Sequence, residues 1–151
     1  WCLEPAGNPK KLVDYITRNT LNELREEFHE IISEEIESLP DALSKINAKT
    51  GKQFIIIIDE WDVLIRDEAA QLDVQEEYIN FLRGLFKGSE PMKYIGLAYI
   101  TGILPIKKLK TQSALNNFDE YTMLDAGEIA KYIGFTQDEV KKLCVKYETD
   151  F

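Results

Sequence analysis

Apolar residues recur at a helical spacing through the first third of the chain. They fall at three- and four-residue steps, while glutamate, arginine and asparagine fill the other face. The apolar positions are Leu12, Ile16, Leu21, Leu24, Phe28, Ile31 and Ile32. This period predicts an amphipathic helix that starts near Pro9, breaks near residue 30 and stops at Pro40. A short helix is expected over residues 41–48, followed by a turn over residues 49–52.

Two later segments have the pattern of buried strands. Phe54–Ile58 is a run of five apolar residues without polar alternation, and residues 94–100 form a second such segment. Strands of this kind are typical of a parallel sheet that helices cover on both faces. Between the two strands, apolar residues at helical spacing predict a helix that Asp73 caps and Gly88 ends.

The rest of the chain predicts a long connection and further short elements. Residues 103–118, ILPIKKLKTQSALNNF, read as a connection, and loops of this length in compact domains are often functional. Glu120–Leu124 is a candidate for a short third strand, and a helix is expected from Asp125 to Ile133. Thr136 and Glu139 have the spacing of a capping box for a last helix.

Strands that alternate with helices predict an α/β fold with a parallel sheet covered by helices. We expect residues 1–151 to form one domain or part of one. The net charge of −9 opposes general binding to nucleic acid or to an anionic membrane. The two cysteines form no CxxC motif, and the longest apolar run is too short to cross a bilayer. We therefore expect a cytoplasmic protein with reduced thiols.

Polar residues come after both predicted strands. Asp59 and Glu60 stand directly after the first strand, and Thr101 stands after the second. Ligands of α/β proteins bind at the carboxyl ends of the strands. In P-loop ATPases an aspartate here holds Mg²⁺, the next glutamate accepts a proton from the attacking water, and a polar residue on the neighbouring strand senses the γ-phosphate. The pattern predicts these three roles for Asp59, Glu60 and Thr101, with Mg²⁺ and ATP as cofactor and substrate.

The motif is short, and other interpretations stay open. Acidic residues at this point can simply end a strand and cap the next element. Two-metal nucleases also gather carboxylates at strand ends, although they take them from separate elements and place a lysine nearby. Here Lys52 lies at the other end of the first strand. The phosphate-binding motif GxxxxGK(S/T) is absent, because Gly51-Lys52 is followed by glutamine and precedes a strand where the motif precedes a helix.

Three segments resemble the bacterial AAA-ATPase-like family. They are FIIIIDEWD, AYITGILPIKKLKTQSALNNFDEYTML and GEIAKYIGFTQDEVKKLC, within residues 54–144, while residues 1–50 match only in helical character. The resemblance implies a P-loop NTPase fold of the additional-strand, AAA-like class. It places the phosphate-binding loop and the first two strands upstream of Trp1. We therefore expect the middle part of a larger protein, inactive by itself, with a PD-(D/E)XK nuclease-like domain further on.

The resemblance also implies roles for individual residues. Asp59 corresponds to the Walker B acid that faces magnesium, Glu60 to the catalytic base and Thr101 to the sensor position. Lys107 and Lys108 lie in the family's IKK block, where they are candidates to face phosphate or a partner. A solvated loop is the open alternative for this lysine pair.

The remaining expectations concern partners. Asp62 belongs to the family motif without a role that the sequence supplies, and Trp61 is expected to pack rather than to stack on a base. Without the strand that carries the phosphate loop, the sheet has exposed edges, which favour self-association. The competing hypothesis is a non-catalytic protein-interaction module that keeps a degenerate ATPase fold.

Overall fold

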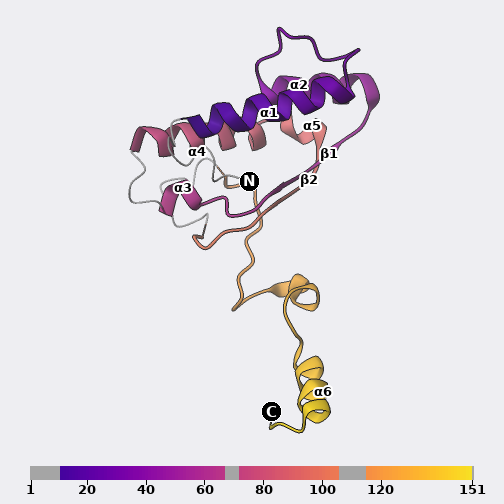
Figure 1. Ribbon diagram of the computed structural model, residues 1–151, viewed down its shortest axis with the longest axis vertical. Helices are drawn as coiled ribbons and strands as arrows, with labels where there is room; N and C mark the ends of the chain where they lie inside the picture. Colours follow the sequence, from indigo (N-terminus) through magenta and orange to yellow (C-terminus); the bar gives the residue numbers. More distant parts are fainter. Residues whose placement is uncertain (1–10, 67–71, 106–114, 151) are drawn as a thin grey trace. The chain divides into compact units, whose positions relative to one another are not determined.

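The computed structural model describes residues 11–66, 72–105 and 115–150 (Figure 1). The chain divides into two compact units, residues 1–117 and residues 118–151. The first unit contains the sheet and the site, and the second contains the last two helical elements.

Two helices open the first unit, and both differ from the predicted ranges. Helix α1 spans Leu12–Glu27 and ends before the predicted break near residue 30. Residues 28–38 form turns and no helix, so the predicted continuation of the helix from the break to Pro40 is wrong. Helix α2 spans Leu39–Thr50, so it includes Pro40 in its first turn and the first two residues of the predicted turn. The Ser38 side chain caps its start, and Gly51 ends it with a φ of 68°, a left-handed conformation that glycine adopts without steric cost.

The sheet consists of two parallel strands that pair side by side, as predicted. Strand β1 spans Phe54–Ile58, and strand β2 spans Ile95–Ile100. Tyr94 belongs to the short helix α5, Pro91–Tyr94, and not to the strand as predicted. Ile58 lies opposite Ile100 in the register, so the two strands end at the same edge of the sheet.

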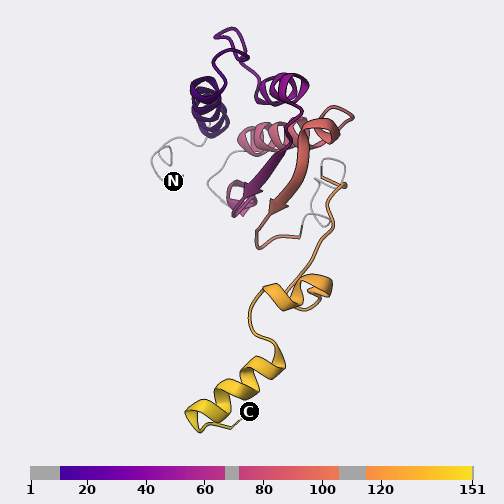
Figure 2. The same ribbon diagram turned by 90° about the vertical axis from the view of Figure 1, so that its right-hand side faces the viewer.

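One face of this sheet is open, which corrects the prediction of strands buried on both faces. Helices α1, α2 and α4 lie on one side of the strands (Figures 1 and 2). On the other face the exposed fractions are 67% for Ile55, 69% for Ile57, 55% for Leu97 and 44% for Tyr99. The apolar run predicts two covering layers, but the described residues supply helices to one face only.

The core of the first unit lies between its helices. Helix α3 spans Val63–Arg66, and helix α4 spans Leu72–Phe86, which includes Asp73 in its first turn. Helix α4 buries Val74, Tyr78, Ile79, Leu82, Leu85 and Phe86, which confirms the helical spacing of its apolar residues. Tyr94 is fully buried, and its hydroxyl donates to the carbonyl oxygen of Leu85 at 3.1 Å. Burial raises the pKa of Tyr94 from the ordinary value of 10.0 to about 12.

The second unit contains helical elements and no strand over its described residues, 118–150. The predicted strand at Glu120–Leu124 is therefore wrong, because a strand needs a neighbour for its N–H and C=O groups and these residues find none. The helix expected from Asp125 to Ile133 is a shorter 3₁₀ helix, η4, over Gly127–Tyr132. Helix α6 spans Gln137–Tyr147.

The capping box of α6 is confirmed. The Thr136 side chain accepts from the Glu139 N–H at 3.4 Å, and the Glu139 carboxylate accepts from the Thr136 N–H at 2.7 Å. The bonds that the Thr136 backbone N–H and hydroxyl donate to the Glu139 carboxylate lower the pKa of Glu139. No residue over 118–150 is buried, so this capping box, rather than burial in the unit, supports the start of the helix.

Candidate functional site

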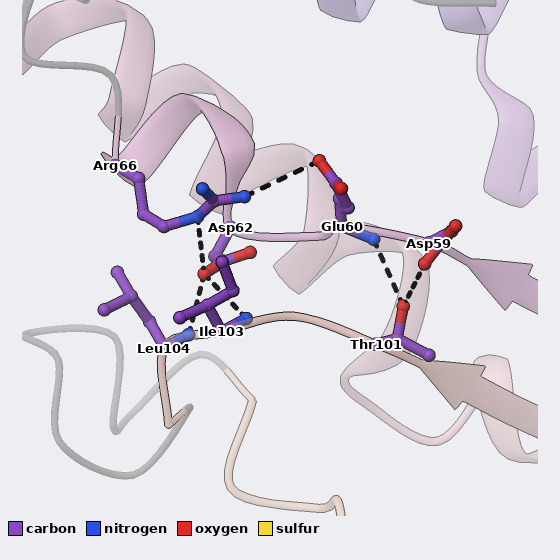
Figure 3. Close-up of polar contacts among 7 residues, drawn as sticks. All are labelled: Asp59, Glu60, Asp62, Arg66, Thr101, Ile103 and Leu104. Atoms are coloured by element: carbon purple, nitrogen blue, oxygen red, sulfur yellow. Dashed lines mark hydrogen bonds and ion pairs between the residues drawn. The ribbon is translucent and has the colours of Figure 1, made fainter.

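Main-chain pairing continues past the ends of both strands and brings the predicted site residues together. The Thr101 N–H donates to the Ile58 carbonyl oxygen at 2.9 Å, and the Thr101 carbonyl oxygen accepts from the Trp61 N–H at 2.8 Å. The turn after β1 is thereby fixed against the residues just after β2. Asp59, Glu60 and Thr101 meet at this edge of the sheet (Figure 3).

The Thr101 hydroxyl connects the two acidic residues. It donates to the carboxylate of Asp59 and accepts from the backbone N–H of Glu60 at 3.2 Å. A hydroxyl group supplies one donor and two acceptor positions, so both bonds are compatible. The sequence predicts one site for these three residues, and in the structure Thr101 forms a hydrogen bond with each of the two acidic residues.

The carboxylates of Asp59 and Glu60 belong to exposed residues. Mg²⁺ at nucleotide sites takes one or two carboxylates, several waters and phosphate oxygens rather than an all-protein cage. Two accessible carboxylates at a strand end fit that donor set. Among the described residues no group of three or more His, Cys, Asp or Glu side chains comes together as a metal cluster.

Glu60 has an unusual backbone. Its φ of 52° lies in the left-handed region, which costs a non-glycine residue about 1–2 kcal/mol. Such conformations gather at functional sites, where the surrounding structure holds them. The side chain of Glu60 also forms an ion pair with Arg66, with 3.6 Å between the carboxylate oxygen and the guanidinium nitrogen.

Asp62 is the buried acid of the site, with a residue exposure of 0%. Its Oδ2 atom accepts from Arg66 Nε at 3.0 Å, from the Ile103 N–H at 3.1 Å and from the Leu104 N–H at 2.7 Å. Its Oδ1 atom is also buried and has no hydrogen-bond partner among the described residues. Figure 3 shows these contacts between the turn after β1 and the segment after β2.

Close packing accompanies this buried carboxylate. A Cβ atom added to Gly102 would lie 2.6 Å from Trp61 Cδ1 and 2.8 Å from Asp62 Oδ1. Trp61 is itself 2% exposed, so the packing role expected for it is confirmed. Glycine at position 102 is therefore the residue that lets the two segments approach each other.

Sequence reasoning missed Arg66 and Gly102 and gave Asp62 no role. The signal for Arg66 was its four-residue separation from Asp62, a spacing at which opposite charges meet on a helix. Lys107 and Lys108, which were predicted to face phosphate or a partner, lie outside the described residues. Lys52 precedes β1 while the acids come after it, so it lies at the other end of the strand from the site.

Comparison with known protein families shows which family the chain matches and over which residues. Residues 5–111 match the family model described as a predicted AAA-ATPase, which is more than half of the chain. The chain belongs to the AAA-ATPase-like family. The match includes the strand-end site of this AAA-ATPase-like chain and also helices α1 and α2, where the sequence resemblance was limited to helical character. It ends at residue 111, so it does not extend to the last segment of the resemblance.

No curated protein and no solved structure matched this AAA-ATPase-like chain. Among the described residues, no helix combines the length and the apolar character that a membrane span requires. The family, the two-stranded parallel sheet and the geometry at the strand ends are therefore the observations that bear on function.

Proposed function

We propose that this chain carries the metal-binding and water-activating side of a Mg²⁺-dependent P-loop ATPase site. The observation that carries the proposal is the meeting of Asp59, Glu60 and Thr101 at the carboxyl ends of two adjacent parallel strands. Strand ends are where α/β proteins bind ligands, and family membership gives this placement a context. The two-stranded sheet is, in this proposal, part of an additional-strand, AAA-like core.

Each residue has a distinct part in the proposed mechanism. Asp59 binds Mg²⁺ through its carboxylate, directly or through water, and the Thr101 hydroxyl fixes the orientation of that carboxylate. Glu60 accepts the proton of the attacking water, for which its exposed carboxylate at the turn is suited. When bound, Mg²⁺ neutralises charge that develops on the phosphate oxygens. Thr101 contacts both acids, and in this proposal it responds to the γ-phosphate.

The phosphate-binding side of the site is proposed to come from another part of a larger protein. GxxxxGK(S/T) does not occur in this sequence, so backbone amides of that loop are not supplied by these 151 residues. We propose that residues 1–151 are part of a cytoplasmic ATPase domain whose hydrolysis acts on a partner domain, such as a PD-(D/E)XK nuclease-like domain. Lys107 and Lys108 remain candidates for a phosphate or partner contact.

The test is Mg²⁺-dependent ATP binding and hydrolysis by a form of the protein that carries a phosphate-binding loop. The 151-residue chain is assayed beside it. Glu60→Gln keeps the shape of the side chain and removes the base, so turnover should fall by about 10²-fold or more while ATP binding persists. Asp59→Asn should weaken the Mg²⁺ dependence of binding. Glu76→Gln, at an exposed glutamate of α4, is the matched control and should change neither quantity.

The outcomes separate the parts of the proposal. Unchanged turnover in Glu60→Gln rules out the general-base role. Micromolar, Mg²⁺-dependent ATP binding by the 151-residue chain alone contradicts the proposed division of the site. If the longer protein, with an intact phosphate-binding loop, neither binds nor hydrolyses nucleotide, the ATPase proposal fails as a whole.

A second candidate function has one specific observation in its favour. The open sheet face presents Ile55, Ile57, Leu97 and Tyr99 to solvent, and contiguous exposed apolar residues often mark interaction sites. A non-catalytic interaction module that keeps the ATPase shape would use such a face, and exposed strand edges would favour self-association. A degenerate phosphate-binding loop in the longer protein, together with no nucleotide binding, would favour this alternative.

A further inference from the structure

We propose that Asp62 and Arg66 are positioning residues of the strand-end site, which hold the segment after β2 and the carboxylate of Glu60 in place. The inference rests on the proposed ATPase function, since it concerns the geometry of the same site. Neither residue is expected to touch nucleotide or metal. Their effect passes through main-chain atoms next to Thr101 and through the side chain of Glu60.

The first step concerns the carboxylate of Asp62. A buried charge is costly unless hydrogen bonds and an opposite charge compensate it. Here three donors converge on one oxygen, and two of them are the main-chain N–H groups of Ile103 and Leu104. Such charge-assisted bonds are stronger than neutral ones. Asp62 therefore fastens the chain immediately after Thr101-Gly102 to the turn that carries the acids.

The second step concerns Arg66, the last residue of α3. Its Nε atom donates to Asp62, and a terminal nitrogen of the same guanidinium group lies 3.6 Å from the Glu60 carboxylate. The guanidinium group is planar and Asp62 holds its Nε edge, so the position of the terminal nitrogen that faces the Glu60 carboxylate is also fixed. The pair with Glu60 is partly exposed and contributes little to stability, so its effect is on orientation.

The third step distinguishes positioning from simple structural support. If Asp62 and Arg66 only stabilised the fold, their removal would lower stability and leave the kinetics of the folded protein unchanged. If they position Glu60 and Thr101, the folded variants should bind substrate normally and turn it over slowly. Gly102 lies close to Trp61 and Asp62, and Asp62 is fully buried. The Asp62 carboxylate therefore contacts both strand-end segments and not solvent.

The first experiment is hydrogen exchange measured by NMR on the 151-residue chain, and it does not depend on ATPase activity. In Asp62→Ala the amides of Ile103 and Leu104 should exchange about tenfold faster or more, because they lose a charged acceptor. If Asp62→Ala fails to fold, Asp62→Leu serves, since it keeps the branched shape of the side chain and has no oxygen to accept either N–H. The matched control is Glu90→Gln, which breaks a side-chain pair with Lys93 outside the site. Unchanged exchange at both amides in a folded Asp62 variant would overturn the proposal that Asp62 holds the segment after β2.

The second experiment is steady-state kinetics on the longer, ATP-hydrolysing protein. Arg66→Met should lower kcat about tenfold or more with KM unchanged, and Arg66→Lys should restore part of the loss. Equal kcat in wild type and Arg66→Met would overturn the positioning role. If the wild-type protein has no ATPase activity, the proposed function and the catalytic positioning fail together. The exchange data still decide whether Asp62 anchors the segment after β2.

Discussion

Gly102→Ala is the change that most directly tests the close packing at the strand ends. The added methyl carbon would lie 2.6 Å from Trp61 Cδ1, 2.7 Å from Trp61 Nε1 and 2.8 Å from Asp62 Oδ1. All three distances are shorter than carbon contacts allow, and neither neighbour is free to move, because both are buried. The chain must therefore shift the segment after β2 away from the turn after β1.

The loss of stability that we expect from Gly102→Ala has two sources. Overpacking a buried region costs about 1–3 kcal/mol. Displacement of residues 103 and 104 also weakens their hydrogen bonds to a charged carboxylate, each of which contributes about 1.5–3 kcal/mol. Partial relaxation reduces both terms, so we expect a loss of about 2–4 kcal/mol in the free energy of unfolding of the first unit.

The assay is urea unfolding monitored by tryptophan fluorescence in a Trp1→Phe background, in which Trp61 is the only tryptophan. Gly84→Ala is the matched control, because it lies inside α4 and a Cβ there meets nothing within 4 Å. It should stabilise the protein by about 0.5–1 kcal/mol, the usual helix preference for alanine over glycine.

A double mutant separates this clash from a general effect of the substitution. Trp61→Phe makes room beside Gly102, so the two changes should be non-additive, with a smaller combined loss than their sum. Circular dichroism monitors unfolding in this variant, because the reporter tryptophan is gone. A neutral Gly102→Ala, or strict additivity with Trp61→Phe, would refute the packing argument.

Three single residues give further predictions. The pKa of Tyr94 is raised to about 12, so protonated Tyr94 stabilises the fold below pH 10. This contribution, on the order of 2 kcal/mol, should be lost between about pH 10 and 12 in an alkaline unfolding titration. Tyr94→Phe should flatten that part of the stability profile. Glu60→Gly should be about 0.5–1 kcal/mol more stable than Glu60→Ala in urea unfolding, because the left-handed backbone favours glycine; the reverse order would contradict the assigned conformation. Thr136→Ala should destabilise α6 by about 1 kcal/mol, because the hydrogen bond from the Glu139 N–H to the Thr136 side chain is lost. Amides in the first turn of the helix should then exchange faster. Thr149→Ala, beyond the helix, should leave the exchange of those amides unchanged.

The sequence by itself was sufficient for the elements whose signals are local. The helical periods of α1 and α4, the apolar runs of β1 and β2 and the capping box at Thr136 are patterns of neighbouring residues, and each was confirmed within a few residues. The meeting of Asp59, Glu60 and Thr101 was also predictable, because parallel strands that pair must end at the same edge.

Tertiary structure decided the features that depend on distant partners. Glu120–Leu124 has strand-like residues, but a strand forms only where a neighbour accepts its main-chain bonds, and none is present over 118–150. The open face of β1 and β2 likewise depends on which layers pack against them and not on their own composition.

The role of Asp62 shows the same limit at the site. It comes three residues after Asp59 among other acidic residues, and the one local signal that distinguishes it is Arg66, four residues further on. Only the approach of the segment after β2, permitted by Gly102, buries this carboxylate and supplies its donors at Ile103 and Leu104. These donors lie about 40 residues away along the chain, and they reach Asp62 only because β2 pairs with β1.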